Sequence, residues 1–227
     1  MDPGVSDTTS DTLRSVDIDA TIALDGRPLG KRGARTRRRL LDATAALLED
    51  HGLRDLRVVD IARAIDASPA TFYQYFRDVE DAVLALAAEV GEDLAPIGDA
   101  LARSWQEPDG LDVARALVAH FMDYWDANRA VLRTRNLTAQ EGDGRFREVR
   151  NRSLAPFREG FATKIADGQR AGRVGPEISP VAAASALCAM LERMAAFHGD
   201  LEPFGASRGD VVETTARLIF QTVTGHP

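Results

Sequence analysis

Residues 68–76 read SPATFYQYF and place four aromatic side chains within five positions: Phe72, Tyr73, Tyr75 and Phe76. The whole 227-residue chain contains nine Phe, three Tyr and two Trp, so this stretch is strongly enriched. Phe72 and Phe76 are four residues apart and share one face of a helix. We therefore predict that these two pack inward. The two tyrosines lie on other faces, where they can meet a partner.

Two further helices are predicted just ahead of this stretch. Leucines recur at helical spacing from Arg35 to His51, before Gly52, which suits a helix C-cap. A second apolar face runs from Val58 to Ala64, and Asp66-Ala67 then forms a tight break. Ser68 and Pro69 restart the chain as N-cap and first helical residue. Two short helices separated by a tight turn predict a helix-turn-helix.

The charge distribution indicates which part of the chain faces nucleic acid. The net charge of the chain is −7. Residues 27–78 contain eleven Lys or Arg against seven Asp or Glu, which gives this segment +4 and leaves −11 for the remainder. Six of the cations lie in the run KRGARTRRR, residues 31–39. A basic segment joined to an acidic body predicts phosphate contact by the segment alone.

Several side chains in residues 27–78 suit contact with DNA. Gln74 offers a donor and an acceptor to a base edge, and Thr71 offers a methyl group or a hydroxyl. Tyrosine hydroxyls donate to phosphate. The residues expected at DNA are Lys31, Arg32, Arg35, Arg37, Arg57, Ser68, Ala70, Thr71, Tyr73, Gln74, Tyr75 and Arg77.

The rest of the chain has the periodicity of helices throughout, so the predicted fold is all-α. A long helix is expected from about Val79 to Trp105, bent or broken at Pro96. The later helices are expected at Leu111 to Ala127, Asn128 to Gln140, Gly144 to Gly172, Ser179 to His198 and Ser207 to Thr224. The predicted domains are a disordered N-terminal arm over 1–26, a three-helix helix-turn-helix domain over 27–78, and a larger helical domain over 79–227, for which the family resemblance described next implies ligand binding and dimerisation.

The stretch VVDIARAIDASPATFYQYFRDVEDAVLALA resembles the DNA-binding region of TetR-type (TetR/AcrR) transcriptional regulators, with a match from about Thr36 to Ala87. Three positions depart from that family's pattern. Asp66-Ala67 stands where Gly-Val is usual, and Arg57 stands where a capping Thr is common. Val79 replaces a phosphate-contacting Lys, a role that Arg77 or the 31–39 run could take over.

The resemblance implies a homodimer that binds a palindromic double-stranded DNA operator and releases it when a small, mainly hydrophobic effector binds. It also implies that the last two long helices pair with those of a second chain. Their apolar stripes give the expected interface, although such stripes can also bury internal core: Leu187, Met190, Leu191, Met194, Val212, Leu218, Ile219 and Val223. The expected pocket residues are Leu101, Trp105, Phe121, Met122, Trp125, Asn136 and Phe157.

Other classes of protein are disfavoured by what the sequence lacks. The four histidines form no catalytic pattern, and there is no Gly-rich phosphate loop, so we expect neither an enzyme nor a cofactor or bound metal. The lone Cys188 fits a reducing compartment and a buried thiol. No charged-then-apolar leader or long uninterrupted apolar run is present, which favours a cytoplasmic protein away from the membrane. A regulator without a small-molecule effector, or an activator in place of a repressor, remains open.

Overall fold

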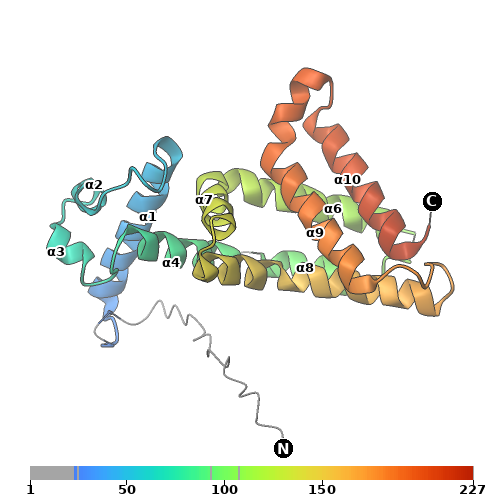
Figure 1. Ribbon diagram of the computed structural model, residues 1–227, viewed down its shortest axis with the longest axis horizontal. Coiled ribbons are helices and arrows are strands. Elements are labelled where there is room, and N and C mark those ends of the chain that lie inside the picture. Colours follow the sequence, from blue (N-terminus) through green and yellow to red (C-terminus); the bar gives the residue numbers. More distant parts are fainter. Residues whose placement is uncertain (1–22, 25, 93, 107, 227) are drawn as a thin grey trace, which may run out of the picture.

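The computed structural model describes residues 23–24, 26–92, 94–106 and 108–226, which fold as two helical lobes joined by one helix (Figure 1). In the first lobe are α1 (Lys31–Asp50), α2 (Val58–Ala64) and α3 (Pro69–Phe72), and α4 (Val79–Glu92) leads out of it. The second lobe contains α5 (Ala95–Ala102), α6 (Gly110–Ala127), α7 (Arg129–Gln140), α8 (Gly144–Arg170), α9 (Pro180–Phe197), the 3₁₀ helix η1 (His198–Phe204) and α10 (Arg208–Thr224). The all-α prediction is confirmed.

The core of the first lobe is built around the aromatic stretch. Phe72 and Phe76 are 0% and 2% exposed, with ring centroids 5.5 Å apart, and they pack with the buried leucines of α1 and Ile61 of α2. The Ser68 hydroxyl accepts a hydrogen bond from the Thr71 N–H at 3.2 Å, so the predicted N-cap is confirmed. The inward pair and the cap together fix where α3 begins and which way it faces.

The ends of α1 and α2 differ in how they are capped. α1 begins at Lys31, four residues before the predicted start, and ends at His51 in extended backbone, so Gly52 does not provide the left-handed cap expected from the sequence. Arg57 holds the N-cap position of α2 and makes no side-chain cap hydrogen bond. Its guanidinium instead bonds Asp60 at 3.0 Å, as expected for a side chain that has no acceptor to offer.

Asp66, in the turn between α2 and α3, has φ of 56° and is the sole described non-glycine residue with positive φ. A Cβ in this left-handed region is strained, and Asp tolerates it better than most residues. We expect Asp66→Gly to raise the free energy of unfolding by about 0.5–1 kcal/mol, because the relief of strain exceeds the added entropy of the unfolded chain. Urea denaturation measures this change. Asp66→Ala is the control, and it should destabilise; a stabilising Asp66→Ala would contradict the assignment of strain.

The second lobe begins where α4 ends. α4 stops at Glu92 and α5 starts at Ala95, with Pro96 in its first turn, so the expected long helix is broken where the proline predicts. Before the break α4 passes close to α8, and a Cβ at Gly91 would collide with the Ser153 hydroxyl of that helix. The two lobes are thus joined by a helix packed directly against the main helix of the second lobe.

α9 is the most apolar of the long helices in the second lobe. With η1 it forms the one described segment, Pro180–Phe204, that is long and apolar enough to cross a membrane by length and composition. That is weak evidence, since a core helix passes the same test. Glu192 of α9 is 5% exposed and paired with arginines of α7 and α8, so this helix contributes a buried carboxylate to the second lobe. Cys188 is also buried, and burial raises the pKa of its thiol to about 12.

Candidate DNA-binding surface and ligand pocket

The face of α3 that points away from the core is formed by exposed, mostly polar residues. Ser68, Ala70, Gln74 and Arg77 are exposed, and Tyr73 is 53% exposed, whereas Thr71 is partly covered. Tyr75 differs from Tyr73, because it is half-buried against the core and its hydroxyl lies beside Gly33 of α1. Of the two tyrosines expected to face a partner, Tyr73 has the open position.

The cationic run at the start of α1 divides into free and engaged side chains. Lys31, Arg32 and Arg35 are exposed and form no ion pair in the described part of the chain. Arg37 was expected at DNA, and the structure corrects this: it is 6% exposed, and its guanidinium pairs with Glu89 of α4 at 2.6 Å and lies over the Phe76 ring. Arg37 therefore lies in the contact between α1 and α4, whereas Lys31, Arg32 and Arg35 lie at the surface.

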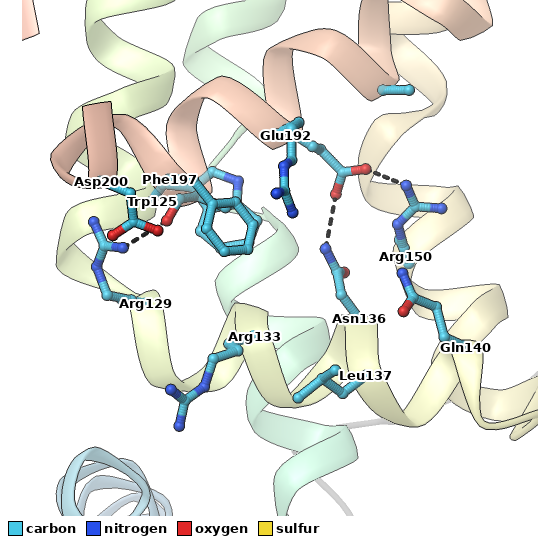
Figure 2. A pocket seen from close by; sticks show the side chains of 13 residues that line it. Trp125, Arg129, Arg133, Asn136, Leu137, Gln140, Arg150, Glu192, Phe197 and Asp200 are labelled. Carbon is cyan, nitrogen blue, oxygen red and sulfur yellow. Dashed lines mark hydrogen bonds and ion pairs between the residues drawn. The ribbon is translucent and has the colours of Figure 1, made fainter. Parts of the chain in front are cut away.

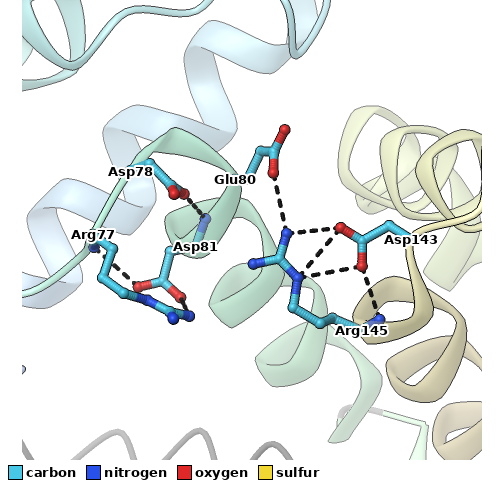
Figure 3. A network of polar contacts seen from close by, with 6 residues as sticks. All are labelled: Arg77, Asp78, Glu80, Asp81, Asp143 and Arg145. Carbon is cyan, nitrogen blue, oxygen red and sulfur yellow. Dashed lines mark hydrogen bonds and ion pairs between the residues drawn. The ribbon is translucent and has the colours of Figure 1, made fainter.

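Several other arginines of the first lobe are bonded within it. Arg38 pairs with Asp42 at 2.8 Å, and Arg39 donates to the Ile65 carbonyl at 2.8 Å, at the end of α2. Arg77 donates to Asp81 at 2.8 Å, and this hydrogen bond raises the pKa of Arg77 (Figure 3). Because the Arg77 side chain is 62% exposed, the guanidinium remains open on its other side to an anion.

The segment just before α1 lies beside α3. The Leu24 N–H donates to the Gln74 carbonyl at 3.4 Å, and residues between 23 and 30 line a hollow together with Tyr73, Gln74 and Tyr75. Residues 23–24 and 26, assigned from the sequence to a disordered arm over 1–26, therefore belong to the first lobe. The rest of that predicted arm, residues 1–22 and 25, lies outside the described residues.

Ion pairs connect the two lobes near the start of α4. Arg145, in the first turn of α8, donates to Glu80 of α4 at 3.1 Å and to Asp143 at 2.7 Å (Figure 3). These hydrogen bonds from Arg145 hold the pKa of Asp143 below its usual value. Arg54, after α1, pairs with Glu141 at 3.2 Å. The junction between α7 and α8 is therefore bonded to the first lobe at two places.

The second lobe contains a cavity of about 600 Å³ between α7 and α9 (Figure 2). Two of the residues expected in a pocket, Trp125 and Asn136, line it. The other five do not, because they are packed in the core: Leu101, Trp105, Phe121, Met122 and Phe157. The Phe121 and Phe157 ring centroids, for example, are 5.3 Å apart. Periodicity identified these residues as apolar and buried but could not separate a filled core from a cavity wall.

The cavity is more polar than the sequence led us to expect. Arginines from α7, α8 and α9 line it with Glu192 and Asp200, and none of them is among the predicted pocket residues: Arg129, Arg133, Arg150 and Arg193. Glu192 accepts from Arg135 and Asn136 at 3.3 Å each, and also from Arg150. The sequence feature that could have indicated a polar cavity is the Glu192–Arg193 pair inside an otherwise apolar helix.

The apolar residues expected at a dimer interface divide between the core and the surface. Leu187, Leu191, Ile219 and Val223 are buried inside the chain, which corrects their assignment to an interface with a second chain. Met190, Met194 and Val212 are partly buried, and Leu218 is 46% exposed. The open surface of α9 also contains Val181 at 63% exposed and Phe197 at 41% exposed, two apolar side chains outside the list of predicted interface residues.

An exposed helix after a tight turn, free cations beside it and a larger helical lobe with a cavity define a helix-turn-helix DNA-binding regulator. The family described as "Bacterial regulatory proteins, tetR family" matches residues 40–86, and the family "Tetracyclin repressor-like, C-terminal domain" matches residues 98–227. The chain belongs to the TetR family and is a transcriptional regulator of that family.

Solved structures share this fold at low sequence identity. The fatty acid degradation regulator FadR from Bacillus halodurans matches with a TM-score of 0.63 and 17% identity over 86% of this chain and 97% of its own. FadR from Bacillus subtilis in complex with stearoyl-CoA matches with a TM-score of 0.62 and 14% identity, over 84% of this chain and 99% of its own. NalD, the secondary repressor of the MexAB-OprM multidrug efflux pump in Pseudomonas aeruginosa, matches with a TM-score of 0.59 and 19% identity, over 84% of this chain and 98% of its own. No curated protein sequence gives a significant match to this chain.

Proposed function

We propose that this chain is a homodimeric, cytoplasmic repressor that binds a palindromic operator and leaves it when a small organic ligand occupies the second lobe. The observation that carries the proposal is the joint surface of α3 and the first turn of α1. Tyr73 and Gln74 are exposed directly after α3, and Lys31, Arg32 and Arg35 lie unpaired on the described part of the same lobe. Base-reading and phosphate-binding groups thus occur together.

The dimer is proposed from the exposed face of α9 and α10. Val181 and Leu218 are large apolar side chains open to solvent on these two helices, which project from the second lobe as a hairpin (Figure 1). The small residues Ala182 and Ala186 of α9 are also exposed. A second copy of the same face would cover these groups, and two-fold symmetry would then place two α3 helices on one operator.

Release of DNA is proposed to act through the connections between the lobes. The Arg37–Glu89 pair joins α4 to α1 in the first lobe. α4 also packs on α8, and Arg150 of α8 lines the cavity. The Arg145–Glu80 pair joins the start of α8 to the start of α4. A ligand that favours one position of α8 would therefore also change the position of α4, and with it the spacing of the two α3 helices. Pro96, in the first turn of α5, lies where the α4 path breaks.

Selection of bound sequences from a random double-stranded DNA pool tests this function. A dimer with two recognition helices should enrich a palindrome. We expect Gln74→Ala to reduce the preference for that sequence over random DNA by about 1–3 kcal/mol, because a base contact is lost. Tyr73→Phe should weaken binding to all sequences about equally, because its hydroxyl meets phosphate.

Gln106→Ala, an exposed substitution of the same type in the second lobe, is the control and should leave the enriched motif unchanged. An unchanged motif and affinity with Gln74→Ala would remove α3 from base reading. Failure of the wild-type protein to enrich any sequence would overturn the proposed function itself.

A further inference from the structure

The cavity between α7 and α9 has an excess of positive charge in its walls. Its acids are Glu192 and Asp200, against the four arginines supplied by three helices. Glu192 is shared by Arg135, which is 1% exposed, and the partly exposed Arg150, so this group of three charged side chains keeps a net positive charge. Charges interact more strongly where water is excluded. Arg150 and Glu192 line the cavity, and Arg135 is bonded to Glu192 without lining it, so the net positive charge of this group attracts an anion.

Two further arginines lining the cavity have no acidic partner within the described residues. The Arg193 guanidinium lies 3.7 Å from the centroid of the Phe197 ring, and Arg133 is exposed on α7. In Figure 2 the Arg133 guanidinium points away from the cavity, and Asp200 lies at the end occupied by Arg129. Arg193 is therefore the best-placed free cation for an anionic group.

A buried hydrogen-bond donor also lacks a partner at this cavity. Trp125 is 3% exposed and lines the cavity, and its indole Nε1 has no hydrogen-bond partner among the described residues. Buried donors are nearly always paired in folded proteins. An acceptor oxygen of a ligand would satisfy a group that the described chain leaves unsatisfied. The Trp125 indole, together with Leu137 and Phe197, also gives the cavity apolar walls.

We propose that this cavity binds an amphipathic organic anion. Its acidic group lies at Arg193 and the Arg135–Glu192–Arg150 group, it accepts a hydrogen bond from Trp125, and its apolar part packs on the Trp125 and Phe197 rings. A volume of about 600 Å³ suits a small organic ligand. This ligand class replaces the mainly hydrophobic one expected from the sequence. The inference rests on the proposed function for its regulatory consequence, whereas the binding chemistry follows from the cavity alone.

A matched pair of fluorescent probes tests the charge preference on the full-length protein. The sulfonate 8-anilinonaphthalene-1-sulfonate and the neutral N-phenyl-1-naphthylamine share one aromatic skeleton and differ by the anionic group. We expect the sulfonate to bind at least about tenfold more tightly than the neutral probe, as for one charge-assisted contact. Equal affinities would overturn the proposal. Displacement of the sulfonate by inorganic sulfate at the same concentration would also overturn it, because a plain anion site needs no apolar walls.

Substitutions in the cavity test whether the preference for the anionic probe arises there. Arg193→Ala should lower the sulfonate affinity about tenfold and change the affinity of the neutral probe by less than about twofold. Trp125→Phe keeps an aromatic ring but removes the N–H, and should also lower the affinity for the sulfonate probe. Arg147→Ala, an exposed arginine of α8 outside the cavity lining, is the control and should change nothing. An unchanged ratio of the two affinities in Arg193→Ala would overturn the assignment, provided that gel filtration shows the wild-type oligomeric state.

Adding the sulfonate probe to the protein bound to its selected operator DNA tests this inference and the proposed function separately. Arg193-dependent binding with release of DNA supports both. Arg193-dependent binding without release supports the ligand class and counts against ligand-induced release. Release of DNA without any difference between the two probes supports ligand-induced release and overturns the anionic ligand class.

Discussion

Glu192→Ala is expected to lower the free energy of unfolding by about 3–5 kcal/mol, because it leaves a buried arginine without its carboxylate. Arg135 is 1% exposed, and its NH2 group lies 3.3 Å from Glu192 Oε1; Asn136 and Arg150 also donate to this carboxylate. Removing Glu192 leaves the buried Arg135 and the partly exposed Arg150 without the carboxylate that they share. Chemical denaturation at fixed protein concentration measures the loss.

Two control variants show whether burial is the cause. Glu148→Ala removes an exposed carboxylate of α8 that pairs with Arg152 at 3.5 Å, and it should change stability by less than about 0.5 kcal/mol. The double variant Arg135→Met, Glu192→Met removes both buried charges and should recover much of the loss, because the partly exposed Arg150 is then the one cation of the group left without its carboxylate. A loss below about 1 kcal/mol for Glu192→Ala would contradict the role given to this network.

Phe72→Ala is expected to destabilise the first lobe by about 3–5 kcal/mol, because it removes a large side chain that is 0% exposed from a small core. The first lobe has little other apolar surface to compensate, so α3 should lose its position and DNA binding should be lost. The second lobe buries many apolar side chains of α5 to α10 and should stay folded. Thermal unfolding followed by circular dichroism should therefore change from one transition to two.

Tyr73→Ala is the matched comparison, since Tyr73 lies next to Phe72 but is 53% exposed. It should change stability by less than about 1 kcal/mol while weakening operator binding strongly. If both variants lost stability equally, the division of the aromatic stretch into a buried and an exposed pair would be wrong. If Tyr73→Ala bound DNA as well as the wild type, Tyr73 would have no place in the DNA surface.

Local chemistry in the sequence predicted most of the helices of this protein. Ser68 accepts a hydrogen bond from a backbone N–H and Pro69 fixes the first helical φ, so α3 begins where these residues predict. Phe72 and Phe76 pack inward because four residues return the chain to the same helix face. Pro96 breaks the helix that would otherwise continue from α4. Each of these effects acts within one or two turns of chain.

Tertiary structure decided which helix faces meet each other, and this changed the assignment of individual residues. Arg37 and Arg35 belong to one cationic run, yet Arg37 pairs with Glu89, 52 residues away, in the α1–α4 contact, whereas Arg35 stays at the surface. Leu218 and Ile219 are adjacent, but packing on α6 and α8 buries Ile219 and leaves Leu218 open. The arginine-lined cavity arises in the same way, because its residues come from α6, α7, α8, α9 and η1. Periodicity shows which residues share a face, whereas the identity of the neighbouring face depends on how distant helices pack, and that packing sets the chemistry of both sites.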